Sequence, residues 1–182
     1  MRDKFWTIRN FQAGELENYY QLHREAEKRD PSGQYFSKQL LAEALGHPGF
    51  HPETDLFLAD SDQGLVGCVS VFLEPGIDRA LLDGLVHPLH RRKGIATDLF
   101  GHAVGYAKAA GIKAAQISIP ETNLAAKKML SGLGLGFLRH FWGYKLDLST
   151  IQLPDITAGD YIFRSLQAGE AQQLTAIQNR SF

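Results

Sequence analysis

The sequence contains a single cysteine, Cys68, which excludes an internal disulfide and a cysteine-based metal cluster. It also lacks an excess of charge of either sign, since 19 Lys and Arg residues oppose 20 Asp and Glu residues. This balance disfavours nucleic acid and anionic membranes as partners. The first residues have no apolar signal-peptide core, and no apolar run is long enough to span a bilayer. We therefore predict a cytoplasmic protein that does not bind a membrane.

What the sequence does contain is an alternation of short apolar runs and amphipathic segments, with 44% hydrophobic residues over 182 positions. This length allows one ordinary domain with little left for a second. The alternation predicts a mixed α/β sheet, antiparallel at first and parallel at the end, where a helix connects two strands. Strands are expected at 5–11, 56–60, 65–73, 79–86, 113–119 and 137–148, the last as one bent strand or a hairpin. Helices are expected at 15–27, 35–45, 94–110 and 123–133.

A basic turn, "HPLHRRKGIATDLF" at residues 87–100, stands directly before the helix that is expected to start near Gly94. The first amide N–H groups of a helix have no intrahelical partner, and the helix dipole adds positive potential there. Together with the side chains of Arg91, Arg92 and Lys93, these donors suit a pyrophosphate. A solvated basic surface turn is the alternative. The turn lacks the Lys-Ser/Thr pair of a Walker loop and the three spaced glycines of a Rossmann fold.

Two motifs, in order, carry a family resemblance. The stretch "LVHPLHRRKGIATDLF" resembles the acyl-CoA-binding motif of the GNAT acetyltransferase superfamily, whose Arg/Gln-x-x-Gly-x-Gly/Ala signature falls on Arg91, Gly94 and Ala96. The stretch "NLAAKKMLSGLGLGF", which starts at Asn123, resembles the next motif of that family. The resemblance extends over residues 5 to about 148. It implies the α/β GNAT fold, a mixed central sheet with a splayed parallel strand pair flanked by helices.

This resemblance implies acetyl-CoA as the co-substrate, with its pantetheine arm between the strands at 79–86 and 113–119 and its pyrophosphate on the basic turn. The residues implied to hold it are Leu85, Val86, His87, Arg91, Arg92, Lys93, Gly94, Ile95, Ala96, Thr97, Asn123 and Lys127. No metal is expected, because His47 and His51 each precede a proline, which favours a loop over a helix.

The resemblance also implies an N-acetyltransferase in which a small-molecule or peptide amine attacks the thioester directly. Asp83 is the first candidate for the base that takes the amine proton, followed by His87 and Glu121, although an acidic residue in a strand is as often structural. Leu130 occupies the position of the family's tyrosine acid, and Tyr144 is a candidate substitute. A catalytically silent acyl-CoA-binding domain that supports a second, active GNAT domain is therefore the alternative.

One stretch recurs near the C-terminus: "IRNFQAGELENYYQLH", which starts at Ile8, returns as "FRSLQAGEAQQLTAIQ", which starts at Phe163. The recurrence predicts a GNAT domain at 1–150, a linker at 151–160 and the first strand and helix of a second, truncated GNAT domain at 161–182. This arrangement is similar to that of tandem acetyltransferases of the mycothiol-synthase type. The expected partner is then that second domain in the parent protein, or a second copy in a homodimer. Chance similarity, or a last strand that completes the first sheet, is the alternative.

Overall fold

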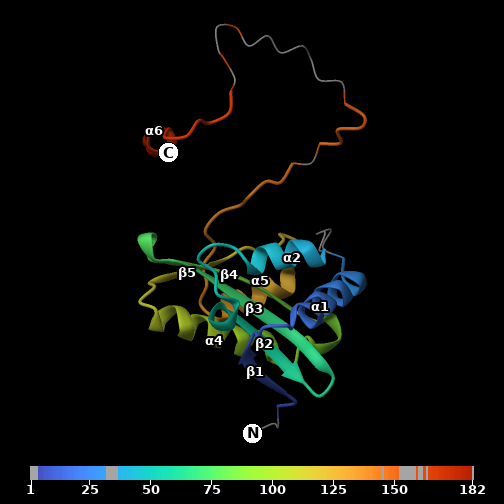
Figure 1. Cartoon of the computed structure of the whole chain (residues 1–182). Coiled ribbons are helices and arrows are strands. Elements are labelled where there is room, and N and C mark those ends of the chain that lie inside the picture. Colours follow the sequence, from blue (N-terminus) through green and yellow to red (C-terminus); the bar gives the residue numbers. More distant parts are fainter. Residues whose placement is uncertain are drawn as a thin grey trace. The chain divides into compact units, whose positions relative to one another are not determined.

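The computed structural model describes residues 4–31, 37–144, 146–151, 159, 162 and 164–181. The chain divides into two compact units, residues 1–136 and residues 137–182. The first unit is a five-stranded sheet with helices packed on its two faces (Figure 1). Within the described residues, no helix combines the length and the apolar character needed to cross a bilayer.

The sheet places its strands in chain order, β1-β2-β3-β4-β5. The first three pairings are antiparallel, and β4 pairs with β5 in parallel. The strands are β1 (Trp6–Asn10), β2 (Leu56–Ser61), β3 (Gly64–Glu74), β4 (Arg79–Val86) and β5 (Ala114–Ile117). The mixed α/β prediction, including the parallel pair reached through a crossover helix, is confirmed.

The four predicted helices of the first unit are present, and two of their boundaries have a clear local cause. A further short helix, Pro52–Asp55, was not predicted, and the first residues of the helix predicted at 35–45 lie outside the described residues. Ser37 accepts the N–H of Leu40 at 3.0 Å and caps the second helix. The helix predicted at 94–110 ends because Gly111 takes a positive φ of 81°. The helices are α1 (Leu16–Arg29), α2 (Lys38–Leu45), α3 (Pro52–Asp55), α4 (Ile95–Ala109) and α5 (Leu124–Gly132).

α4 covers one face of the sheet because its apolar residues recur every four positions. Ile95, Leu99, Ala103 and Ala107 are buried against side chains of the strands. On the opposite face α1 and α2 pack over β2 and β3, where Cys68 is buried. Burial raises the pKa of the Cys68 thiol to about 12, so this cysteine is a buried apolar group and not a nucleophile.

The turn between β1 and α1 is held by a cluster of charged side chains. The Arg9 guanidinium donates to both carboxylate oxygens of Glu15, at 2.8 and 2.6 Å, and to Asp60 of β2 at 2.8 Å. Glu15 also accepts the backbone N–H of Gln12 at 2.8 Å, and Gly14 takes a positive φ of 93°. The strand, the turn and the start of α1 are thus fixed to one another and to β2.

The second unit contains α6 (Ala171–Ser181), and the turn before it repeats the turn before α1. Arg164 donates to both carboxylate oxygens of Glu170, at 2.8 and 2.7 Å, and the Gln167 N–H donates to the same carboxylate at 2.8 Å. Gly169 takes a positive φ of 92°. The recurrence in the sequence is therefore also a recurrence in local structure. The predicted linker lies outside the described residues, apart from positions 151 and 159.

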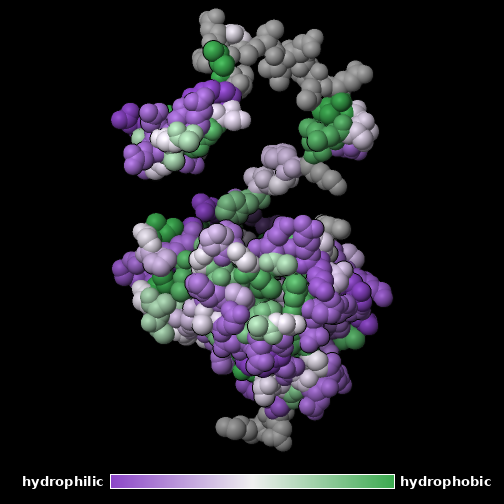
Figure 2. All heavy atoms as spheres, viewed as in Figure 1, coloured by the Kyte–Doolittle hydropathy of each residue, from purple (hydrophilic) through white to green (hydrophobic). Residues whose placement is uncertain are grey.

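The strand predicted at 137–148 is wrong: the described residues of this stretch form no strand. Their large apolar side chains, among them Phe137, Phe141 and Trp142, are exposed. Figure 2 shows hydrophobic residues, in green, along this part of the chain. Apolar residues stand here in adjacent pairs such as Phe141 and Trp142. Because neighbouring residues of a strand point to opposite faces, a single buried face cannot cover such pairs.

Candidate functional site

β4 extends beyond its partner β5. The parallel pairing runs from Arg79 and Ala114 to Leu82 and Ile117, and β5 stops there, two residues before its predicted end at Ile119. Among the described residues, no strand lies beside the rest of β4 on the β5 side. The parallel pair is therefore splayed, as the sequence resemblance implies. The gap leaves backbone hydrogen-bonding groups available to an extended ligand.

One hydrogen bond shows which groups of β4 face this gap. The His87 N–H donates to the carbonyl of Val66 on β3 at 3.0 Å, so the backbone of His87 points away from β5. Because successive strand residues turn their backbone groups to opposite edges, Leu85 also faces β3, whereas Gly84 and Val86 face the gap. The backbone N–H of His87, expected to pair with the cofactor, is thus already used. On the gap side, the backbone N–H of Val86 is oriented to serve as a donor in place of the His87 N–H.

A tight turn joins β4 to α4 through a short 3-10 helix, η2 (Pro88–His90). Arg92 takes a positive φ of 64° and Gly94 one of 97°, so the chain changes direction sharply before α4 starts. A Cβ added at Gly94 would meet only Trp6, at 4.0 Å, so conformation and not lack of space requires glycine here. The first N–H groups of α4 have no intrahelical partner. The turn therefore gathers amide donors at the end of β4, as an anion site requires.

The three basic side chains of the turn have different surroundings. Arg91 donates from Nε to the last carbonyl of β4 at 3.2 Å and forms an ion pair with Asp30 at the end of α1. Lys93 lies over the ring of Phe5, with Nζ 4.8 Å from the centroid. Arg92 is exposed. Arg91 thus shapes the turn through contacts within the protein, while Arg92 and Lys93 stay at the surface, where an anion can reach them.

His87, the second predicted base, is tied into the turn. Its Nδ1 accepts the N–H of Leu89 at 3.3 Å, and its ring centroid lies 5.4 Å from that of His90. Burial, and after it the charge of Arg29, lowers the pKa of His87, so the imidazole is neutral at pH 7. A neutral imidazole whose Nδ1 accepts a hydrogen bond carries its proton on Nε2. His87 therefore has little capacity left to act as a base.

Asp83, the first predicted base, lies opposite Ser70 of β3, just past the last paired residues of β4 and β5. Solvent reaches its side chain, yet the surrounding protein desolvates the carboxyl and raises its pKa above the ordinary value. A hydrogen bond from the Gly84 N–H acts in the opposite direction and is the smaller effect. A raised pKa makes Asp83 a stronger base than an ordinary aspartate, and unlike the His87 ring its carboxylate is not tied into the turn by a hydrogen bond from Leu89.

The remaining predicted residues lie on α5, next to it and in the second unit. Asn123 accepts a backbone N–H at 3.0 Å and caps α5, and Lys127 pairs with Glu121, the third candidate base. Leu130, at the position of the family's tyrosine acid, is buried and apolar. Tyr144 belongs to the second unit, where its side chain is exposed, and its role as an acid stays a prediction.

Within the described part of the chain, no group of three His, Cys, Asp or Glu side chains is placed to hold a metal ion. His47 packs edge-on against Phe72, with ring centroids 5.3 Å apart. The expectation of a metal-free reaction stays a prediction.

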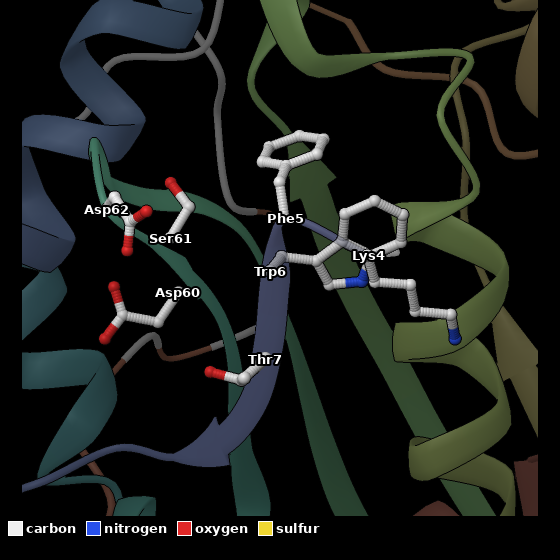
Figure 3. Close-up of a pocket in the computed structure, with 7 residues that line it drawn as sticks. All are labelled: Lys4, Phe5, Trp6, Thr7, Asp60, Ser61 and Asp62. Carbon is white, nitrogen blue, oxygen red and sulfur yellow. The ribbon is translucent and has the colours of Figure 1, made fainter. Parts of the chain in front are cut away.

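Two surface hollows lie beside β1, and β4 and β5 line neither of them. One, of about 760 Å³, follows α4 and includes Trp6, Phe57 and Tyr106. The other, of about 370 Å³, is formed by residues of β1 and the end of β2 (Figure 3). The β4–β5 gap is a slot beside a strand edge and not an enclosed cavity, which suits an extended ligand better than these hollows do.

The five-stranded sheet with its splayed parallel pair is the fold of an acetyltransferase domain. The sequence profile of the acetyltransferase (GNAT) family matches residues 9–135, so the chain belongs to this family. The family expected from the two motifs is confirmed.

Relatives agree with this assignment. Over 154 residues the chain is 30% identical to the mycothiol acetyltransferase of Paenarthrobacter aurescens (strain TC1), an alignment that covers 79% of this chain and 46% of that protein. The chain thus spans about half the length of this relative. An aminoglycoside acetyltransferase from an uncultured soil sample, solved with trehalose, has a TM-score of 0.60 at 18% identity, covering 81% of this chain and 100% of that one. The PaiA N-acetyltransferase of Thermoplasma acidophilum, solved with coenzyme A, has a TM-score of 0.57 at 19% identity, covering 70% and 87%.

Two contacts of the turn could not be found by sequence reasoning. Asp30, which pairs with Arg91, is 61 residues away in the chain. Phe5, under Lys93, comes from the start of β1, at the other end of the domain's sequence. No motif or periodicity connects such distant positions, and only the folded sheet brings them together.

Proposed function

We propose that this domain transfers an acetyl group from acetyl-CoA to an amine, by direct attack of the amine on the thioester. The observation that carries the proposal is the free edge of β4 beyond Leu82, which leads directly into the amide-rich turn before α4. The amides of pantetheine suit a strand edge, and the pyrophosphate suits a helix N-terminus. The gap and the turn follow one another in the same order as these two parts of acyl-CoA.

In this proposal the Val86 N–H faces the arm, and the N–H groups of residues 92–97 hold the pyrophosphate. The side chains of Arg92 and Lys93 add positive charge at the surface of the turn, in support of the helix dipole. Asn123 and Lys127 flank the arm from α5. The co-substrate that this arrangement fits is acetyl-CoA, and coenzyme A is bound in the solved PaiA acetyltransferase.

The reaction needs a base, a hydrogen-bond donor for the oxyanion and a proton source for the departing thiolate. Asp83 accepts the proton of the amine, whose nitrogen attacks the carbonyl carbon, and the Val86 N–H stabilises the oxyanion that forms. The C–S bond then breaks and the thiolate of CoA leaves. Leu130 has no proton to give, but a thiol pKa of about 8.5 lets the thiolate leave and take its proton from solvent.

The acceptor that we propose is a small-molecule amine. The relatives support this class, because one is a mycothiol acetyltransferase and another an aminoglycoside acetyltransferase by name. A peptide amine is the alternative acceptor, because direct attack on the thioester is open to it as well.

Replacement of the base tests the proposal. Asp83→Asn should lower kcat in a thiol-release assay with a panel of amines by about 10²- to 10⁴-fold, while the affinity for acetyl-CoA changes little. Asp78→Asn is a matched control, because Asp78 pairs with Lys113 on the surface and has no part in the proposed site. Equal rates for Asp83→Asn and the unmodified chain would contradict the assignment of the base.

A second candidate function is favoured by Leu130, whose buried side chain replaces the family's proton donor. In that case the domain binds acyl-CoA without turning it over and supports a catalytic domain elsewhere. The two candidates differ in one assay: the silent domain binds acetyl-CoA tightly yet acetylates no amine of the panel. Leu130→Tyr should raise the rate only if the gap is catalytic, with a thermal melt to check that the larger side chain is tolerated.

We also propose that residues 164–181 begin a second domain of the same fold. The support is the repeated turn, in which Arg164 and Glu170 reproduce the contacts of Arg9 and Glu15. Arg9 has a further partner in Asp60 of β2, so Arg164 is expected to meet an acidic residue of the second domain. That second domain, or a second copy of the chain, is the partner that we expect for the first.

A further inference from the structure

A cluster of aromatic and basic side chains stands beside the turn that we assign to the pyrophosphate. The Phe5 ring lies 4.9 Å from the Trp6 ring in an edge-on arrangement and 5.8 Å from the ring of His90. Lys93 Nζ is 4.8 Å from the Phe5 centroid. Phe5 is nevertheless 42% exposed, so part of its ring is open to a ligand. The acetyl transfer described above has no need of the Phe5 ring.

The position of Phe5 against the turn is fixed by its neighbours. Trp6 is buried, and its Nε1 donates to Asp98 in the first turn of α4 at 3.2 Å. Asp98 also accepts from Lys4 at 2.6 Å. The residues on both sides of Phe5 are thus tied to the start of α4. The ring is held next to the helix N-terminus instead of hanging freely from the end of the chain.

The hollow of about 370 Å³ beside β1 gives room next to the ring. Figure 3 shows Phe5 at one end of this hollow, with Ser61 and Asp62 across from it. The Asp62 carboxylate accepts hydrogen bonds, which suits an N–H donor such as an exocyclic amine, and its charge repels a phosphate. The Ser61 hydroxyl already donates to the Gly64 carbonyl at 3.0 Å and accepts the Gln63 N–H at 3.2 Å, and it has one further lone pair for such a donor. Lys93, over the Phe5 ring, carries the positive charge that suits a phosphate.

We propose that Phe5 is a stacking platform for the adenine ring of bound acyl-CoA, and that Lys93 leaves the Phe5 ring to meet the 3′-phosphate. This inference rests on the proposed function, because the pyrophosphate held at the turn brings the adenosine end within reach of both side chains. Stacking on an aromatic ring is tolerant of the base but needs ring surface open to it, and Phe5, 42% exposed, gains more of that surface once Lys93 moves away. The exocyclic amine of adenine then points toward Ser61 and Asp62.

Calorimetric titration of the full chain with two ligands tests the stacking. Coenzyme A has the adenosine end, and 4′-phosphopantetheine lacks it. Phe5→Ala should weaken the binding of coenzyme A roughly 5- to 100-fold and leave that of 4′-phosphopantetheine within about twofold. Phe5→Tyr keeps the aromatic face and should bind coenzyme A as the unmodified chain does. Ile77→Ala, which removes another exposed apolar side chain outside the site, is the control.

The outcomes separate this inference from the proposed function. If the unmodified chain binds coenzyme A and Phe5→Ala weakens both ligands equally or neither, the stacking platform is refuted while the acyl-CoA site stands. If the unmodified chain binds neither ligand, both the proposed function and the platform fail. Retained affinity for 4′-phosphopantetheine also shows that Phe5→Ala is folded.

The role of Lys93 has its own comparison, between coenzyme A and 3′-dephospho-coenzyme A. The unmodified chain should prefer coenzyme A, and Lys93→Gln should reduce that preference by up to about fivefold at low salt, since exposed charge pairs are weak. A preference that Lys93→Gln leaves unchanged would overturn the 3′-phosphate contact.

Discussion

Gly94 is the residue at which backbone conformation and proposed binding are most closely linked. Its φ of 97° costs an L side chain roughly 1–3 kcal/mol, although there is open space around it. Gly94→Val should therefore distort the turn and weaken acetyl-CoA at least about tenfold in a calorimetric titration. Gly101→Val adds the same atoms in the middle of α4, where φ is negative and space is open, and should leave the affinity unchanged. Unchanged affinity in Gly94→Val would remove the turn from the binding site.

Asp83→Asn should lower the activity of the protein and raise its stability. The pKa of Asp83 is higher in the folded chain than in the unfolded chain, so the protonated carboxyl favours folding. This contribution to stability is complete at pH values below the unfolded-state pKa. It is lost as the pH rises through the folded-state pKa. Asp83→Asn removes a charge that the surrounding protein desolvates and should raise the melting temperature at pH 7 to 8, with the gain shrinking toward pH 4. The acetylation rate of the unmodified chain should fall as pH drops through the raised pKa. A lower melting temperature for Asp83→Asn at pH 8 would mean that the carboxylate is a structural group.

The two repeated turns give a matched test at the scale of elements. Glu15 holds β1, α1 and β2 together through Arg9, and both side chains are partly buried. Glu15→Gln should lower the free energy of unfolding by about 1–3 kcal/mol, because the guanidinium loses a charged partner. Glu170→Gln makes the same change in an exposed turn of the second unit and should alter the main unfolding transition by less than about 0.5 kcal/mol. Chemical denaturation of both variants measures these changes. Equal losses of unfolding free energy would show that the two turns contribute equally to stability.

Elements with a clear period could be predicted from the sequence, and elements that depend on a distant partner could not. α4 follows from Ile95, Leu99 and Ala103 at helical spacing, and its end follows from Gly111. The turn was also predictable, because a basic glycine-containing motif is local in the chain. The strand predicted at 137–148 was wrong because aromatic residues favour strands only where a neighbouring strand and a buried face are available.

The candidate site divides in the same way. Asp83 and the turn follow from the family motifs, whereas the use of the His87 N–H by Val66 follows only from the register of β3 and β4. A shift of one residue in that register would exchange the edges that Val86 and His87 face. Such a choice is made by packing of the whole sheet and leaves no trace in a single stretch of sequence.

For the whole molecule, the two units should differ strongly in protection from hydrogen exchange. Buried side chains anchor α4 to the sheet, whereas Leu174 and Ile177 of α6 are exposed. We expect α6 amides to exchange orders of magnitude faster than those of α4, because local opening there costs little free energy. Strong protection of α6 that does not depend on protein concentration would contradict its assignment to the start of a second domain.

The proposed site pairs acyl-CoA with the free edge of β4 and places its pyrophosphate on the turn before α4. An amide-resolved NMR titration of the full chain with acetyl-CoA can locate the bound ligand residue by residue. We expect the largest shifts at the Val86 amide and at the amides of residues 92–97, while the His87 amide, bonded to Val66, changes less. Shifts confined to the hollow along α4, or no shifts at saturating acetyl-CoA, would rule out this site.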